Sequence, residues 1–580
     1  MYADRLAARR AAAAQLRTRL DTLSAARLGV FAAGLVVAGL ALGDLVSPYF
    51  VFVPVVAFAG LVAKYEGVKL RIAWGERGSH FYAAGLARLD GKPLGGHDGA
   101  RFADDAHPYA ADLDLFGPGS LFALLSTART RGGEDTLAAW LKAAASPAEV
   151  ASRQAAVADL TPRLDLREAL AVAGADVPPA DYDSIAKWGT EDIPAPPAWK
   201  RWAIEVLGWG NFAAWFGWLF VGTTSLPVVA FGLPSLLLAV PHMAWSRRVL
   251  APVERAEREL SLLESILARL EREPFTSPRM KALQSSLSAA AQIRELRTLV
   301  GWFNARRNAL FIPVAFLRMW DTRYAFKLER WRARSGRAIG PWLTAIGEAE
   351  ALSSLAGFAF ENPADVFPTV GAGAARFAAT GLGHPLLPAA KCVRNDVSFG
   401  DSPRLLVISG SNMSGKSTLL RSVGVNAVLA LAGGVVRAES MSLTPVALGA
   451  TMRVQDSLQA GRSRFFAEVA KVRALLDIAT ANSPPLLFLL DELFSGTNSA
   501  DRVAGAEGVI RTLLDCGAIG LVTTHDLALT DVTARLPGAV NVHFCDGFAG
   551  GELSFDYTMR PGVVPHGNGL ALMRAVGLRV

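Results

Sequence analysis

Long apolar stretches alternate with charged segments along this 580-residue chain. Residues 28–46 contain a single charge, Asp44, and residues 49–63 contain none. A second apolar pair, 206–221 and 226–245, flanks a short turn at 222–225. About twenty helical residues cross the hydrocarbon core of a bilayer, so each stretch is close to the short limit of a span. The pattern predicts two transmembrane helical hairpins, and the alternative is two buried hairpins inside a large soluble core.

Basic residues border both apolar pairs, whereas neither turn contains a lysine or an arginine. The positive-inside rule therefore predicts a multi-pass protein of the inner (cytoplasmic) membrane, with its soluble parts in the cytoplasm. Tryptophans at 202, 209, 215, 218 and 245 suit the two interfaces of a bilayer. The flanking basic residues are Arg5, Arg9, Arg10, Arg17, Arg19, Arg27, Lys64, Lys69, Arg71, Lys200, Arg201, Arg247 and Arg248.

Composition agrees with soluble domains joined to membrane segments. The chain is 51% hydrophobic and 19% charged, and its mean hydropathy is +0.29, which is more apolar than a typical soluble enzyme. The net charge of +7 suits either anionic lipid headgroups or phosphodiesters. Three cysteines, Cys392, Cys516 and Cys545, provide neither a disulfide framework nor a zinc-binding spacing.

The chemistry is concentrated in the carboxyl-terminal third. An apolar run at 405–408 predicts a buried strand, and a segment suited to a helix begins near Lys416. Between them lies a G-x-x-x-x-G-K-[ST] phosphate loop, whose backbone N–H groups surround phosphates. We expect Lys416 to reach the terminal phosphates of ATP and the Ser417 hydroxyl to bind Mg²⁺. The nucleotide-binding residues are Gly410, Ser411, Asn412, Met413, Ser414, Gly415, Lys416, Ser417 and Thr418.

Two further apolar runs end in polar residues of the kinds that hydrolysis of ATP at a phosphate loop requires. Residues 486–490 lead into Asp491 and Glu492, a Walker B pattern in which Asp491 holds magnesium and Glu492 orients or deprotonates water. Residues 518–522 lead to His525, which we expect to sense a terminal phosphate from the end of its strand. The predicted catalytic residues are therefore Glu492, His525 and Lys416.

Together, several motifs resemble the ATPase domain of the MutS family, relatives of the ABC ATPases. They are residues 453–468, Asn412-Met413, Asp491-Glu492-Leu493, Gly496-Thr497-Asn498 and Thr523-Thr524-His525. In that family two such domains face each other, and the resemblance implies a homodimer in which Ser463 acts in trans. Ser411 stands where the family commonly has proline, and Ser414 stands where it commonly has a third glycine.

The resemblance covers roughly residues 119–175 and 340–580 and reaches the family's helical core. Family members that read mismatches insert an apolar wedge with a Phe-x-Glu sequence into the duplex. The fifty residues before 119 contain no recognisable wedge of this kind. Phe358-Ala359-Phe360-Glu361 has the letters of the pattern but lies where a packing role is expected. DNA is therefore a candidate ligand, but mismatch reading is poorly supported. The predicted divisions are 1–27 a basic helix, 28–64 and 201–246 the transmembrane hairpins, 65–118 a small connecting segment, 119–200 and 247–375 the core, and 376–580 the ATPase domain.

Three local questions stay open from the residues alone. Apolar residues at 253, 256, 260, 263, 267 and 270 form a heptad seam, which belongs either to a helix leading toward a distal clamp or to antiparallel packing in the core. Residues 309–317 are apolar but too short to span, and lie either on the membrane surface or inside the protein. Tyr557 either stacks on adenine or packs within a strand.

The predicted fold is α+β and multidomain, with two transmembrane hairpins, a mainly helical core and a carboxyl-terminal α/β P-loop domain of ABC-like type. We expect a membrane-anchored MutS-like ATPase that uses ATP and Mg²⁺ at a dimeric site and contacts membrane lipid. The alternative is an ABC-like mechanical ATPase that acts on membrane components or a membrane protein without DNA.

Overall fold

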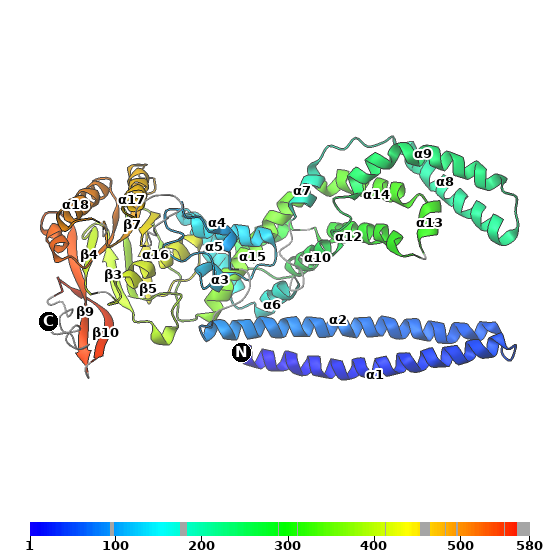
Figure 1. Cartoon of the computed structure of the whole chain (residues 1–580), viewed down its shortest axis with the longest axis horizontal. Coiled ribbons are helices and arrows are strands. Elements are labelled where there is room, and N and C mark those ends of the chain that lie inside the picture. The colour runs from blue at the N-terminus through cyan, green and yellow to red at the C-terminus, as the bar shows by residue number, and fades with distance from the viewer. Residues whose placement is uncertain are drawn as a thin grey trace. The chain divides into compact units, whose positions relative to one another are not determined.

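The computed structural model is mainly helical, and its sheets lie in the carboxyl-terminal part of the chain (Figure 1). It describes residues 1–92, 98–173, 182–287, 289–309, 311–411, 413–452, 464–481, 483–494, 497–549 and 552–564. The chain divides into two compact units, Met1–Gly95 and Gly96–Val580.

The first unit is an antiparallel pair of long helices, α1 (Tyr2–Leu42) and α2 (Phe52–Leu89), joined through the 3₁₀ turn η1 (Pro48–Val51). Arg17 pairs with Glu76, and the Phe31 and Phe58 rings lie 6.0 Å apart between centroids. Both helices are longer than the apolar stretches that predicted them, because the flanking segments are rich in helix formers such as Ala and Arg. The predicted divisions at residues 27 and 64 therefore lie inside helices, and the expected connecting segment begins as part of α2.

Among the described residues, four helical segments are long and apolar enough to cross a membrane: Tyr2–Leu42, Pro48–Leu89, Ala198–Val221 and Leu226–Leu250. Their most apolar windows are 0%, 0%, 22% and 11% buried within the chain. These apolar windows are thus largely exposed within the chain, unlike the buried hairpins of the alternative.

The second unit begins with a helical core organised around α15 (Ile339–Glu361). This helix packs against α4 (Arg131–Lys142) and α5 (Pro147–Leu160). Phe358 and Ala359 are buried near its end, which confirms the packing role expected for that motif. The other core elements are η2 (Ala100–Phe102), α3 (Leu121–Leu125), α6 (Leu164–Ala173), α7 (Asp183–Thr190), α10 (Glu257–Glu271), α11 (Pro278–Ser286), α12 (Ala290–Asn304), η4 (Ala305–Arg307), α14 (Trp320–Ser335) and η5 (Gly336–Ala338).

The heptad seam is buried between helices of this core. Helix α10 packs on α12, and the order of contacts shows that they are antiparallel: Glu271 accepts from Ala289 N–H at one end, and Asn304 donates to Glu257 at the other. All six seam positions are buried. Of the two open alternatives, antiparallel packing inside the core is confirmed.

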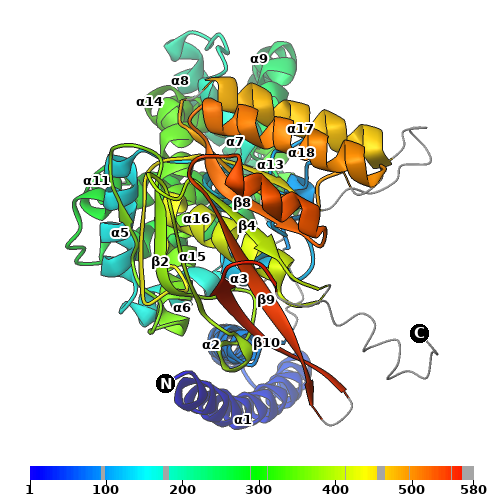
Figure 2. The ribbon, with the colours of Figure 1, turned by 90° about the vertical axis from the view of Figure 1, so that its left-hand side faces the viewer.

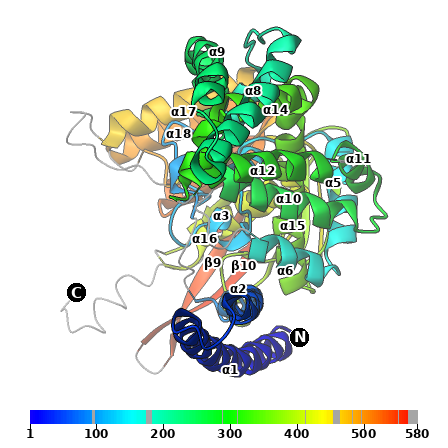
Figure 3. The same cartoon turned by 90° about the vertical axis from the view of Figure 1, so that its right-hand side faces the viewer.

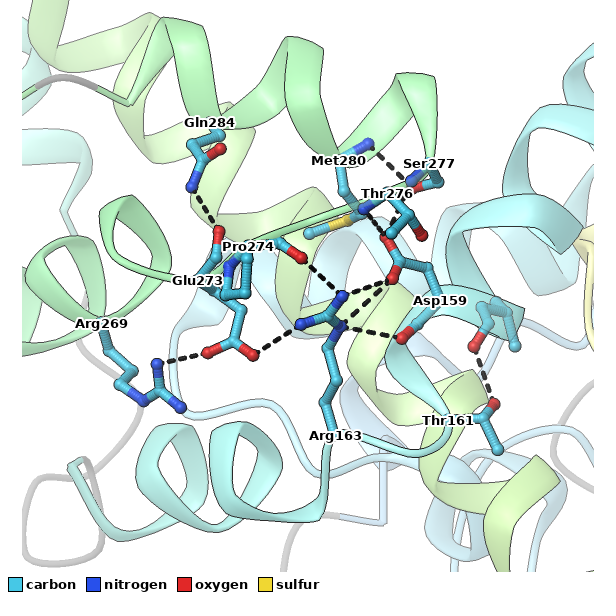
Figure 4. A network of polar contacts seen from close by, with 11 residues as sticks. Asp159, Thr161, Arg163, Arg269, Glu273, Pro274, Thr276, Ser277, Met280 and Gln284 are labelled. Carbon is cyan, nitrogen blue, oxygen red and sulfur yellow. Dashed lines mark hydrogen bonds and ion pairs between the residues drawn. The ribbon is translucent and has the colours of Figure 1, made fainter.

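Polar contacts also join the two parts of the core that the second hairpin separates in sequence (Figure 4). Arg163 pairs with Asp159 and with Glu273, each at 2.8 Å. Asp159 accepts from the backbone N–H groups of Thr276 and Ser277. Although burial would raise the pKa of Asp159, these donors together with Arg163 hold it at about 2. The carboxylate therefore stays charged and fixes the turn before α11 against α5.

The second hairpin consists of α8 (Ala198–Phe216), the π-helical turn η3 (Gly217–Val221) and α9 (Leu226–Leu250). Figure 3 shows the hairpin with α14 alongside, and the Trp245 and Phe326 rings lie 4.7 Å apart. Near it, α13 (Ile312–Leu317) leaves Phe316 80% exposed. The alternative in which residues 309–317 lie inside the protein therefore does not hold for the Phe316 side chain.

The carboxyl-terminal region is a six-stranded sheet of order β10-β9-β4-β8-β7-β6, parallel except at β10. Side chains alternate between its faces: Leu406 and Ile408 join the core that includes α16 (Lys416–Ala432), whereas Leu405 and Val407 pack with α17 (Arg464–Ala481) and α18 (Ser499–Asp515). Figure 2 shows this end of the unit. The strands are β4 (Leu405–Ser409), β6 (Ala447–Thr451), β7 (Leu486–Asp491), β8 (Ile519–Thr524), β9 (Ala539–Ala549) and β10 (Glu552–Pro561), with η7 (Leu527–Ala534) after β8.

A smaller sheet of order β1-β5-β2-β3 takes three strands from the segment before β4 and one, β5, from between α16 and β6. The rings of Phe377 and Phe399 stack across β2 and β3 with centroids 5.2 Å apart. Its strands are β1 (Thr369–Val370), β2 (Phe377–Leu382), β3 (Asn395–Phe399) and β5 (Ser440–Leu443), with η6 (Ala389–Lys391) between β2 and β3.

The segment before the core is attached to the α/β domain. Ala450 on edge strand β6 donates its N–H to Pro108 O at 2.9 Å, and Met452 donates to Asp112 Oδ1 at 2.8 Å. Leu113 and Leu115 are fully buried. Residues 98–118, the second part of the predicted connecting segment, are thus packed within the second unit.

Candidate functional site

The phosphate-loop sequence lies between β4 and α16, as the sequence predicts. Gly410 and Gly415 have φ values of 155° and 107°, in the region that favours glycine. A Cβ on Gly410 would lie 2.9 Å from Ser414 Oγ and 3.0 Å from Phe544 O, so the loop has no room for a side chain there. Met413 also has a positive φ, 70°, and its side chain is exposed.

Lys416 is held inside this loop. Its Nζ donates to the carbonyl oxygens of Gly410 and Ser411, each at 2.8 Å. Burial lowers the pKa of Lys416, and Glu492, Asp491 and Asp546 oppose that effect. The ammonium group therefore lies among acidic residues at the point where the loop closes.

The two serines that depart from the family pattern fit the loop. Ser414 Oγ donates to Ser411 O at 2.8 Å, so the hydroxyl completes the turn where glycine is common. Ser411 Oγ is buried and has no hydrogen-bond partner among the described residues.

The acidic pair follows β7, next to the end of β8. The register pairs Asp491 with Thr523 and Ser409 with Thr524, so β4, β7 and β8 end together. Thr523 Oγ1 donates to Asp491 Oδ1. Glu492 has a φ of 48°, an unusual value for a residue with a side chain, and its N–H donates to Thr523 O at 3.3 Å.

Glu492 lies between the lysine and the histidine. Its Oε1 is 3.9 Å from Lys416 Nζ and 3.3 Å from His525 Nδ1. One carboxylate thus contacts both other residues of the predicted catalytic set. The structure brings Lys416, Glu492 and His525 together, with Asp491 beside them at the end of the same strand.

The predicted magnesium ligands are compatible with a cation held partly by phosphate. Ser417 is half-buried in the first turn of α16, Thr418 beside it is exposed, and Asp491 is half-buried. Within the described ranges, no group of three or more His, Cys, Asp or Glu side chains forms a metal cage. Mg²⁺ in nucleotide sites needs only one or two protein ligands in addition to phosphate and water, so Ser417 and Asp491 suffice in number.

Tyr557 lies at the loop. A Cβ on Gly415 would be 3.1 Å from Tyr557 Cδ1, so the ring covers the glycine that ends the loop. Asn395 holds this part of β10 from both sides, because it donates to Tyr557 O at 3.0 Å and accepts from Met559 N–H at 2.7 Å. The tyrosine is 44% exposed and stacks on Phe555.

Sequence reasoning did not assign a role to Thr523 or Asn395. Both are hydrogen-bonded to residues of the site: Thr523 to Asp491, and Asn395 to the backbone of Tyr557. Other predicted residues fall outside the described part of the chain: Asn412, Ser463 with the rest of 453–463, and Gly496.

The strand order and the loop define an α/β domain in which a phosphate-loop sequence links the central parallel strand to a buried helix. Residues 406–579 match the family model described as MutS domain V. The match covers under a third of the chain, and this part is therefore similar to domain V of the MutS family.

Archaeal relatives match the same part of the chain. The DNA mismatch repair protein MutS 2 of Haloarcula marismortui is 38% identical over 204 residues, which cover 34% of this chain and 21% of the relative. The MutS 2 protein of Halobacterium salinarum is 36% identical over 199 residues, 34% and 23% of the two chains. The DNA mismatch repair protein MutS of Natronomonas pharaonis is 35% identical over 200 residues, again 34% and 23%. The match spans about a fifth of the length of these relatives.

Proposed function

We propose that this protein is a membrane-anchored MutS-type ATPase that binds ATP and Mg²⁺ at residues 410–418 and hydrolyses the nucleotide. The observation that carries the proposal is the convergence of Lys416, Glu492 and His525 at the ends of β4, β7 and β8. Ligands of parallel α/β sheets bind at the carboxyl ends of the strands, which supports this placement.

Each side chain has a distinct part in the proposed reaction. Loop N–H groups and Lys416 hold the phosphates, while bound magnesium would neutralise their charge through Ser417 and Asp491. Glu492 accepts a proton from the attacking water or orients it, and His525 positions the carboxylate from 3.3 Å away. Tyr557 covers the loop beside Gly415 and offers an aromatic face for the base.

We place the working site in a homodimer, with Ser463 of each protomer contributing to the other site. The support is the MutS resemblance of residues 453–468, which precede and begin α17. Anchoring is supported by four exposed apolar helices with basic flanks. The ATPase domain would then lie on the cytoplasmic side of the inner membrane.

Two variants of the full-length chain in detergent test the assignment. Glu492→Gln is expected to bind ATP normally but lose turnover by at least about 100-fold, because the general base is removed. Lys416→Ala is expected to lose nucleotide binding as well. Normal steady-state hydrolysis by Glu492→Gln would show that the carboxylate has another role.

The nature of the partner separates two versions of the function. DNA mismatch repair relatives favour duplex DNA, whose binding should weaken steeply with salt. The exposed apolar helices favour the second version, an ABC-like mechanical ATPase that acts on membrane components without DNA. Stimulation of ATP turnover by duplex or mismatched DNA would support the first version, and stimulation by lipid alone would support the second.

A further inference from the structure

A basic pocket lies at the base of the second hairpin, away from the nucleotide site. It has a volume of about 300 Å³ and lies between the first turns of α8 and the middle of α14. Its lining residues are Arg201, Trp202, Ile204, Glu205, Arg323, Phe326, Lys327 and Arg330. Four cations and one carboxylate give the lining a net charge of +3.

The single carboxylate is already occupied. Glu205 Oε1 accepts from Arg323 Nε at 2.7 Å, and Glu205 Oε2 lies 3.5 Å from Arg318. In the part of the chain that the structure describes, Arg201, Lys327 and Arg330 have no carboxylate partner. Burial lowers the pKa of Lys327, and the nearby cations Arg323, Arg330 and Arg318 add to this effect against the opposing charge of Glu205. Glu205 therefore offsets only part of the positive charge that gathers here.

The surroundings of the pocket are apolar and aromatic. Trp202 lines it and is 67% exposed, and the Arg201 guanidinium lies 5.9 Å from that ring centroid. Trp199, Val206 and Trp209 continue the exposed surface along α8. The same helix forms most of the candidate span Ala198–Val221. Tryptophan beside basic residues is the composition found at the interface of a bilayer, where phosphate adjoins hydrocarbon.

We infer that this pocket binds the phosphate headgroup of an anionic phospholipid at the cytoplasmic surface of the membrane. Arg201, Lys327 and Arg330 supply the charge, and Trp202 and the exposed face of α8 contact the acyl region. A duplex DNA backbone would offer the same phosphates but no apolar partner for these tryptophans, so lipid is favoured. The inference rests on the proposed membrane anchoring and extends it by naming the lipid class.

The site is built on α14, which packs against both helices of the hairpin (Figure 3). Phe326 lines the pocket and also contacts Trp245 of α9, with ring centroids 4.7 Å apart. A bound headgroup would thus contact α8 and α14 together. We expect its binding to stabilise the attachment of the hairpin to the core.

Binding of a water-soluble, short-chain phospholipid tests the pocket without requiring a membrane. The full-length protein in detergent is titrated with dihexanoyl phosphatidylglycerol and with dihexanoyl phosphatidylcholine, and bound lipid is counted by native mass spectrometry. The pocket variant is Arg201→Gln, Lys327→Gln, Arg330→Gln. The matched control is Arg258→Gln, Arg272→Gln, Lys281→Gln, which removes the same charges from exposed core positions.

The wild type and the control are expected to prefer the anionic lipid. Each removed cation should weaken binding about fivefold, so the pocket variant should lose affinity on the order of 100-fold. Arg330→Gln alone, at an exposed position, should show the fivefold loss and decides the matter if the triple variant does not fold. Unchanged affinity in these variants would overturn the inference.

Competition and extraction experiments separate the other outcomes. Displacement of the lipid by inorganic phosphate at equal concentration would show a free-phosphate site, and displacement by duplex DNA would show a nucleic-acid site; either result overturns the lipid assignment. Extraction of the wild type from membranes by alkaline carbonate would contradict the proposed anchoring but not the pocket. Firm anchoring with no preference for phosphatidylglycerol would contradict the pocket alone.

Discussion

Asp112 and Lys471 form an ion pair of 2.5 Å that joins the segment before the core to α17 of the α/β domain. The Asp112 side chain is fully buried, and its other oxygen accepts from Met452 N–H, next to edge strand β6. Helix α17 directly follows the residues expected to act in trans. The pair therefore fixes the segment before the core to α17, the helix that follows Ser463, where the dimer contact is proposed.

Removing this charge should destabilise the protein. We expect Asp112→Asn to cost about 3 kcal/mol, because Lys471 would keep its charge in a largely buried place without its partner. Thermal unfolding of the full-length protein measures the loss. The matched control is Asp477→Asn on the same helix, whose exposed pair with Arg473 should contribute no more than about 0.5 kcal/mol. Equal Tm values for the two variants would contradict the structural role of Asp112.

Glu350 should make stability depend on pH. Complete burial raises its pKa to about 7, even though Arg129 N–H, Thr130 N–H and Thr130 Oγ1 donate to the carboxylate. The folded protein therefore keeps this proton up to about pH 7, while the unfolded chain releases it near the ordinary value of 4.5. Stability from this group is present below 4.5 and is lost as pH rises to about 7, by about 3 kcal/mol.

Thermal unfolding at pH 5 and pH 7.5 measures this dependence. Glu350→Gln cannot ionise and should remove that part of the slope. Glu348→Gln, on the same helix but half-buried and paired with Arg279, should keep the slope of the wild type. The role assigned to Glu350 would be wrong if both variants retained an unchanged slope.

Glycine sets the spacing of the second hairpin. A Cβ on Gly210 would lie 2.2 Å from Phe231 Cδ1, whereas one on Gly232 would meet its nearest atom at 3.8 Å. Gly210→Ala should therefore destabilise the hairpin by about 1–3 kcal/mol, since Phe231 must move. Gly232→Ala should be neutral or stabilising by up to about 1 kcal/mol. Limited proteolysis and Tm in detergent compare the two, and equal behaviour would contradict the packing of α8 on α9.

Tyr557 offers a test of the nucleotide site that leaves the catalytic residues unchanged. Tyr557→Ala should weaken ATP binding about five- to tenfold, because an aromatic stack contributes about 1 kcal/mol, and Tyr557→Phe should bind as the wild type does. Equilibrium binding of a fluorescent ATP analogue measures the change. Thr558→Ala, at the exposed neighbouring position, is the control. Unchanged affinity in Tyr557→Ala would favour the alternative in which the ring only packs.

The sequence predicted the parts of the fold that depend on local pattern. The runs at 405–408, 486–490 and 518–522 became β4, β7 and β8, because a strand buried on both faces must be apolar at every position. The heptad seam likewise identified the buried face of α10. In these places, the spacing of the apolar residues and the polar residues that end each run were enough to predict the element.

Contacts between distant segments could not be predicted in this way. Nothing local marks Asp112 as the partner of Lys471, or Asn395 as the residue that holds Tyr557, because each pair is separated by more than 160 positions. The ends of α1 and α2 were also missed, since hydropathy marks the apolar part of a helix and not the charged turns that extend it. At the site, the phosphate-loop motif predicted Lys416 and the strand ends predicted Asp491, Glu492 and His525, whereas Thr523 needed the register of the sheet.

Helices α14 and α15 follow each other with only the 3₁₀ turn η5 between them, and they lead from the hairpin to the helices that pack on α16. At about 1.5 Å per residue this run is roughly 60 Å long. The turn is held where Gly189 and Gly336 touch, since a Cβ on either would lie 2.4 Å from the other's carbonyl oxygen. The two helices thus form one long connection, with a close glycine contact at the turn between them. Over such a length, a tilt of about 5° at one end would displace the other end by about 5 Å, which is close to the pitch of one helical turn.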